Sequence, residues 1–112
     1  MTQEQFIQCC KTQGNLDLEA WDVMLWQPLK DVHAWWSRQS SSMQAFTAFL
    51  LGRSQPAFAR WIAVAAGVAE AELGVAFGAA LIAVVAGLGL GTAMDVIGRC
   101  GIMDLEEDPP SA

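Results

Sequence analysis

Apolar residues recur at helical spacing along most of the chain. Leu18, Trp21 and Leu25 stand at positions i, i+3 and i+7, and a similar repeat runs through 29–36 and 43–50. Residues at this spacing share one face of an α-helix. No run alternates between apolar and polar residues for long enough to predict a β-strand. The pattern therefore predicts an all-α fold.

Residues that typically begin or end helices interrupt this pattern. Thr2 and Gln5 have the spacing of a capping box, and Gly14 is of the residue type that commonly ends a helix. Ser54 followed by Pro56 predicts another helix start, because serine caps the first turn and proline is tolerated within it. We expect a succession of short helices in the first half of the chain.

Composition divides the chain into three regions. Residues 1–40 mix charged, aromatic and polar side chains, which predicts an amphipathic helical region. Residues 41–98 are mainly apolar or small, which predicts a membrane region. Residues 99–112 end in acidic residues and prolines, which predict a solvated acidic tail.

The longest uncharged run lies in the second region. Leu73–Met94 comprises 22 residues, of which only Thr92 has a polar side chain. As a helix it would extend about 33 Å, enough to cross a hydrocarbon core of about 30 Å. The alternative is a buried helix or hairpin of a soluble bundle, but a chain of this size has little interior to enclose it. We therefore predict an integral membrane protein with a spanning helix at 73–94.

A second apolar stretch, residues 57–69, precedes this predicted span and is too short to cross a bilayer alone. It predicts either an interfacial segment with Trp61 at headgroup depth or one arm of a tight membrane hairpin. Glu70 and Glu72 separate the two apolar stretches. Because a carboxylate facing lipid is costly, we expect this pair at the membrane boundary or in a polar lumen formed by several chains. The region thus holds one or two closely packed membrane helices.

Small residues recur at every fourth position within the predicted span. Such residues let two helix backbones approach closely, which favours helix pairing in lipid. Self-association, or packing on a partner membrane helix, is one interpretation; chance in a segment rich in alanine and glycine is the other. The predicted helix-packing residues are Gly74, Gly78, Ala79, Ala83, Gly87 and Gly91.

Four of the five tryptophans lie in 21–36. A small helical core that packs on itself is one interpretation of this cluster. The other is a belt of interfacial aromatics, formed by Trp35, Trp36 and Trp61, that anchors the helices to a bilayer. His33 lies beside the cluster as the single histidine of the chain, and we expect it to be solvated or part of the core.

Features that would support catalysis are sparse. Six basic and 12 acidic residues give a net charge of −6, which argues against nucleic-acid binding because that requires a basic surface. Cys9, Cys10 and Cys100 match no zinc or redox spacing, and we expect reduced thiols. His33 has no evident nucleophile or metal-ligand partner, and the glycines lack the spacing of a phosphate loop. The sequence predicts a protein that is not an enzyme and has no cofactor and no metal.

Two short runs resemble lambda-type phage holins. The run AFLLGR at 48–53 with AF at 57–58 is similar to the junction after the first span in that family. The run GT at 91–92 with DVIG at 95–98 is similar to the close of its last span. The resemblance covers residues 43–99. Holins of this type are inner-membrane phage proteins that oligomerise and open lesions for an endolysin, so the resemblance implies a non-enzymatic membrane protein.

Three functions are compatible with these features. The first is membrane-embedded self-assembly in the bacterial inner membrane, as in a phage holin. The second is an accessory subunit that docks on a larger membrane complex. The third is a soluble α-helical inhibitor that binds a host protein. The first two make membrane lipid and a second copy or a partner membrane helix the expected partners.

Overall fold

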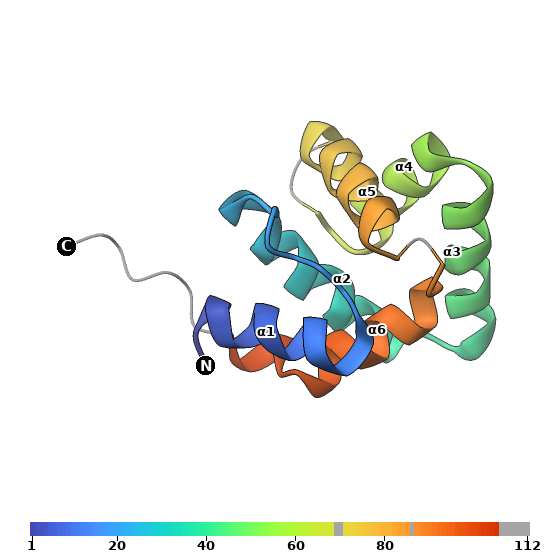
Figure 1. Cartoon of the computed structure of the whole chain (residues 1–112). Helices are drawn as coiled ribbons and strands as arrows, with labels where there is room; N and C mark the ends of the chain where they lie inside the picture. Colours follow the sequence, from blue (N-terminus) through green and yellow to red (C-terminus); the bar gives the residue numbers. More distant parts are fainter. Residues whose placement is uncertain (69–70, 86, 106–112) are drawn as a thin grey trace.

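The described part of the chain is built from helices (Figure 1). The computed structural model describes residues 1–68, 71–85 and 87–105, and no strand forms among them. The all-α prediction is confirmed. The elements are α1 (Gln3–Gly14), η1 (Val23–Leu25), α2 (Trp26–Arg38), α3 (Ser41–Arg53), α4 (Gln55–Ala65), α5 (Ala71–Val85), α6 (Leu90–Arg99) and η2 (Ile102–Asp104), where η marks a single 3-10 turn.

Local capping explains where α1 and α4 begin. The hydroxyl of Thr2 accepts the Gln5 N–H at 3.2 Å, and Gln5 Oε1 accepts the Thr2 N–H at 2.9 Å. Ser54 Oγ accepts the Ala57 N–H at 3.3 Å, and Pro56 lies in the first turn of α4. First-turn N–H groups have no partner inside the helix, so these bonds stabilise the start of each helix. Both starts match the sequence-based prediction.

Residues 15–22 form a loop, and the helix predicted from Leu18, Trp21 and Leu25 is wrong in this stretch. Asn15 ends α1 in the left-handed conformation, with φ of 57°. The side chain of Asp17 then accepts the N–H of Glu19, as Asp22 does for Met24. Such bonds stabilise turns in place of helix. The apolar spacing here supplies buried side chains to a loop, and helical structure resumes at η1.

The two ends of the chain share one core, which crosses the boundary between the predicted regions. Helix α6 packs against α1, α2 and α3, and Figure 1 shows α1 and α6 lying along one another. Gly14 allows this approach, because a Cβ at that position would lie 2.5 Å from Cγ2 of Val96. The core therefore joins residues predicted to be an amphipathic N-terminal region to residues predicted to lie in a membrane.

In the described part of the predicted acidic tail, some side chains are packed on the protein, whereas Arg99, Met103 and Asp104 are exposed to solvent. Ile102 and Leu105 are buried, η2 packs on α2, and Lys30 Nζ donates to the Leu105 carbonyl at 2.9 Å. Residues 106–112 lie outside the described residues. The prediction of a tail beginning at residue 99 missed these apolar positions, which stand among the acidic ones.

The predicted continuous helix over 73–94 is wrong. Helix α5 ends at Val85 and α6 begins at Leu90. Gly87 and Gly89 have φ of 85° and 88°, in the left-handed half of the map that glycine adopts without steric penalty. Helix α6 then turns Leu90 and Ile97 into the core and Asp95 to solvent. Much of the apolar run therefore finds its apolar surroundings inside the protein.

Among the described helices, none by itself combines the length and the apolar composition needed to cross a bilayer. Leu73–Val85 and Leu90–Arg99 meet both criteria only when they are counted together, across a bend of 92°.

Candidate binding surface

The predicted helix-packing glycines of α5 lie against α4. A Cβ at Gly74 would lie 3.0 Å from Cβ of Ala63, and one at Gly78 would lie 3.1 Å from Cβ of Ala59. The α4–α5 contact is the most extensive between helices of the described chain. The close approach that these glycines allow is thus made within the chain, between α4 and α5. The membrane hairpin that was one of the two interpretations of residues 57–69 stays a prediction.

The other four predicted packing residues do not all lie on one helix face. Only Ala79 and Ala83 share a face, that of α5. Ala79 and Ala83 are exposed on α5, and Ala83 borders an open hollow of about 410 Å³ beside Trp21. Gly87 lies in the turn after α5, and a Cβ added at Gly91 would lie 3.9 Å from Cζ2 of Trp36. The four-residue repeat requires a continuous helix, and the break after Val85 removes it.

The predicted interfacial aromatics divide between core and surface. Trp35 and Trp36 are 7% and 8% exposed, so they are core residues and not interfacial anchors. Trp61 is partly buried and stacks edge-on against Trp35, with ring centroids 6.3 Å apart. The predicted boundary carboxylates cannot be compared in the same way. Glu70 lies outside the described residues, and of Glu72 only the backbone, in α5, is described.

Helix α3 presents an aromatic surface to solvent. Phe46 and Phe49 are 45% and 58% exposed, and they stand on one face with Arg53 because the three are spaced three and four residues apart. The Arg53 guanidinium lies 5.9 Å from the centre of the Phe49 ring, a cation–π distance. Large apolar side chains exposed next to one another are a feature of interaction sites.

Thr47 fixes the orientation of this helix. It is fully buried, donates its hydroxyl to the Met43 carbonyl at 2.9 Å and accepts Trp61 Nε1–H at 3.1 Å. Phe46 meets the edge of the same Trp61 ring at 5.5 Å. Because Thr47 is held inward, Phe49, two positions further along α3, points away from α4. The exposure of the aromatic surface follows from this anchoring.

The surface carries a positive charge in an acidic protein. Residues 32–69 contain Arg38, Arg53 and Arg60 and no acidic residue, whereas the whole chain has 12 acidic residues. All three arginines are exposed. Phe46, Phe49 and Arg53 are exposed on α3, and Arg60 is exposed on the next helix, α4; we call these four side chains together the α3–α4 surface. The acid-free stretch and the spacing of 46, 49 and 53 are the sequence signals for this surface, whereas the net charge of the whole chain is negative.

Two open hollows adjoin this surface. One, of about 700 Å³, is lined by Phe49, Arg53 and Ser54 among others. The other, of about 430 Å³, lies between α3 and the turn joining α5 to α6, and its lining is apolar. Ala48 and Gly52 line both hollows. Both hollows are open to solvent, the larger one more so than the smaller.

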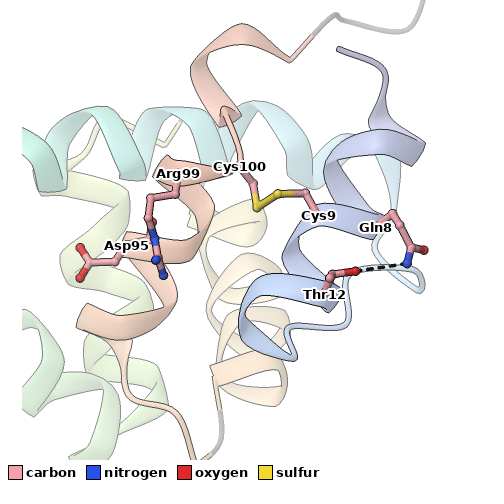
Figure 2. The surroundings of a disulfide bond; sticks show 6 residues. All are labelled: Gln8, Cys9, Thr12, Asp95, Arg99 and Cys100. Carbon is pink, nitrogen blue, oxygen red and sulfur yellow. Dashed lines mark hydrogen bonds between the residues drawn. A yellow bond between two sulfur atoms is a disulfide. The ribbon is translucent and has the colours of Figure 1, made fainter.

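A disulfide joins Cys9 of α1 to Cys100, directly after α6, with Cα atoms 5.7 Å apart (Figure 2). The prediction of reduced thiols is wrong for this pair. The spacing of 91 residues gave no local sign of it. Cys10 is free and fully buried, and burial raises the pKa of its thiol to about 12. Its thiolate, the reactive form, is therefore suppressed at neutral pH.

His33 is a partly buried histidine of α2 that faces α6. Its Nδ1 is buried without a hydrogen-bond partner, and its Nε2 occupies space that a side chain at Gly98 would need, 2.6 Å from an added Cβ. Burial lowers the pKa of His33 below 6.5, and the opposing field of Asp95 raises it less. Within the described residues, no three histidine, cysteine or acidic side chains gather to form a metal site.

Comparisons with protein families, with curated proteins and with solved structures found no match. The resemblance to lambda-type holins therefore stays a prediction.

Proposed function

We propose that the protein is a non-enzymatic helical protein that docks on an anionic bilayer through its α3–α4 surface. The observation that carries the proposal is the pairing of exposed Phe46 and Phe49 with Arg53, within a stretch of 38 residues that lacks any acid in a protein of net charge −6. Phenylalanine and arginine side by side match the boundary between acyl chains and phosphates. Membrane lipid thus stays the expected partner, through a docked face in place of a straight span.

The physical basis of docking is twofold. Each phenylalanine transfers apolar surface from water into the acyl boundary, which for a whole side chain contributes about 1.5–3 kcal/mol. Each arginine near an anionic surface contributes about 1 kcal/mol more, and its aliphatic stem can lie along the apolar layer while the guanidinium reaches the phosphates. We therefore propose reversible docking, because binding at the interface grows with the apolar area buried and with the attraction to anionic lipids.

Vesicle sedimentation tests this proposal. The protein is expected to sediment with vesicles containing a phosphatidylglycerol fraction and less with neutral vesicles, with a salt dependence that reflects the arginines. Replacing Phe46 and Phe49 together by serine should lower the affinity at least about tenfold, equal to about 1.4 kcal/mol. Val23→Ser with Met24→Ser is the matched control, because these two apolar residues are as exposed but lie in η1. Equal loss in both double variants would contradict docking through α3.

The disulfide bears on localisation. Disulfides persist in oxidising compartments such as the bacterial periplasm and are rare in the cytosol. We therefore propose that docking takes place on the outer face of the bacterial inner membrane. When the cells are lysed directly into denaturant that contains an alkylating agent and no reducing agent, mass measurement should find Cys10 as the single alkylated cysteine. Three alkylated cysteines would favour the cytosolic side.

Self-assembly in the membrane, including holin function, is a second candidate. The observation that favours it is the exposure of Ala79 and Ala83 one turn apart on α5, where a second copy could approach closely. Crosslinking in membranes tests it: Ala83→Leu should lower the oligomer yield, while Ala45→Leu, an exposed alanine on α3, should leave the yield unchanged.

A protein partner is the third candidate, as an accessory subunit of a membrane complex or as an inhibitor of a host protein. Phenylalanine, tryptophan and arginine are also enriched at the centres of protein interfaces. This candidate would be favoured over the bilayer if the protein did not bind vesicles and if Phe49→Ser nevertheless abolished the effect that expression of the parent has on cells.

A further inference from the structure

We infer that the two adjoining hollows beside α3 form a binding site for a single-chain fatty acid. The apolar hollow between α3 and the α5–α6 turn accepts the chain, and the hollow at Arg53 and Ser54 accepts the carboxylate. The inference rests on the proposed function in one respect, since Phe49 and Arg53 belong to both the site and the docking surface.

The apolar half is suited to a hydrocarbon chain. Its volume is about 430 Å³, and Leu51, Ile82, Val85 and Leu90 contribute aliphatic side chains to its lining. Ile82 and Leu51 are only partly buried in the chain as it stands, so an occupant would remove further apolar surface from water. That burial contributes about 25 cal/mol for each square ångström.

Glycine keeps the passage between the hollows open. Gly52 lines both of them, and no atom lies within 4 Å of a Cβ added there. Gly87 and Gly89 line the far side with the same absence of neighbours. We therefore place the aliphatic chain across Gly52, between the α5–α6 turn and Arg53.

Charge complementarity selects an anionic head. Arg53 is exposed at the end of α3 and lines the second hollow together with Phe49 and Ser54. The adjoining sequence, residues 32–69, has no acidic side chain to compete for the guanidinium. A planar guanidinium binds a carboxylate through two parallel hydrogen bonds. A single aliphatic chain ending in a carboxylate matches both halves of the site.

Titration of the uniformly ¹⁵N-labelled full chain with dodecanoate, at pH 8 and below the concentration at which it forms micelles, tests the inference. Saturable shifts are expected at the amides of Gly52, Gly87 and Gly89. Gly52→Leu should weaken binding more than about tenfold by filling the passage. Arg53→Gln should weaken it about fivefold, the effect of a surface charge pair. Arg60→Gln, which removes an arginine outside both hollows, should bind as the parent does.

Dodecyltrimethylammonium supplies the same chain with the opposite charge. The parent should bind this cation more weakly than it binds dodecanoate. The Arg53→Gln variant should bind the two ligands equally well. Equal affinity of the parent and Gly52→Leu for dodecanoate, or shifts that do not saturate below the micellar concentration, would overturn the inference. If Gly52→Leu unfolds, Arg53→Gln and the cationic probe still decide it.

Vesicle binding separates the inference from the docking proposal. Gly52→Leu should keep its affinity for anionic vesicles while losing dodecanoate, because Phe46, Phe49 and Arg53 remain. Binding of dodecanoate by a protein that ignores vesicles would overturn docking and support the site. Binding of vesicles without saturable binding of dodecanoate would do the reverse.

Discussion

Cys9 and Cys100 lie 91 positions apart in sequence, and their disulfide joins α1 to the end of α6. Because of this separation, the one bond closes nearly the whole described chain into a loop. Helix α6 also packs on α2 and α3. Figure 2 shows the bond between the two helices, with Asp95 of α6 pointing away from α1. The bond therefore restricts the unfolded chain far more than a local bridge would.

Removing this bond should lower the free energy of unfolding substantially. Closing a loop of this length stabilises a protein by about 4 kcal/mol in the chain-entropy account. Cys9→Ser with Cys100→Ser should therefore shift the urea midpoint downward, and a reducing agent should shift the parent to the same value. The double variant itself should not respond to the reducing agent. An unchanged midpoint in the parent after complete reduction would mean that the bond contributes nothing.

Stability should depend on pH through His33. The pKa of His33 is lowered in the folded state, so the unfolded chain binds a proton near pH 6.5 more readily than the folded chain does. The free energy of unfolding should be fully retained above pH 6.5 and fall as the pH decreases below it. Urea titrations between pH 7.5 and 5.5 measure this slope. His33→Gln should reduce the slope, and an identical slope in the variant would assign it to other groups.

Two neighbouring positions of α5 should respond differently when their side chains are enlarged. Gly78→Leu places a side chain against Ala59 of α4 and should destabilise the protein by about 1–3 kcal/mol, as overpacking does. Ala79→Leu adds the same side chain at an exposed position and should change stability by no more than about 0.5 kcal/mol. Thermal melts of both variants compare them. Similar losses would show that α5 is not held against α4 through Gly78.

Alanine should stabilise the chain at Gly52 and destabilise it at Gly87, although neither added Cβ meets a neighbour within 4 Å. Gly52 is helical, where alanine is favoured by about 0.5–1 kcal/mol. Gly87 has φ of 85°, where a Cβ costs about 1–2 kcal/mol. Opposite shifts in the denaturant midpoint are expected. A gain at Gly87 would mean that the turn between α5 and α6 adopts another conformation in solution.

Part of the α3–α4 surface was readable from sequence. The spacing of Phe46, Phe49 and Arg53 places them on one helix face, and the acid-free stretch 32–69 marks its charge. Its exposure was not readable, because it depends on the hydrogen bond between Trp61 and Thr47 across two helices. The adjoining hollows depend further on the position of the α5–α6 turn, which no local pattern specifies.

The sequence by itself determined the helical class and several helix starts. Thr2 with Gln5, and Ser54 with Ala57, form their capping bonds over three residues. Because these bonds join residues close in sequence, the local sequence pattern is enough to predict them. Only the tertiary structure decided how the apolar run after residue 73 is used. Gly87 permits helix and turn alike, and packing of α6 on α1, α2 and α3 selects the turn. The pairing of Cys9 with Cys100 has the same cause, because contacts between distant residues arise only after the helices have packed.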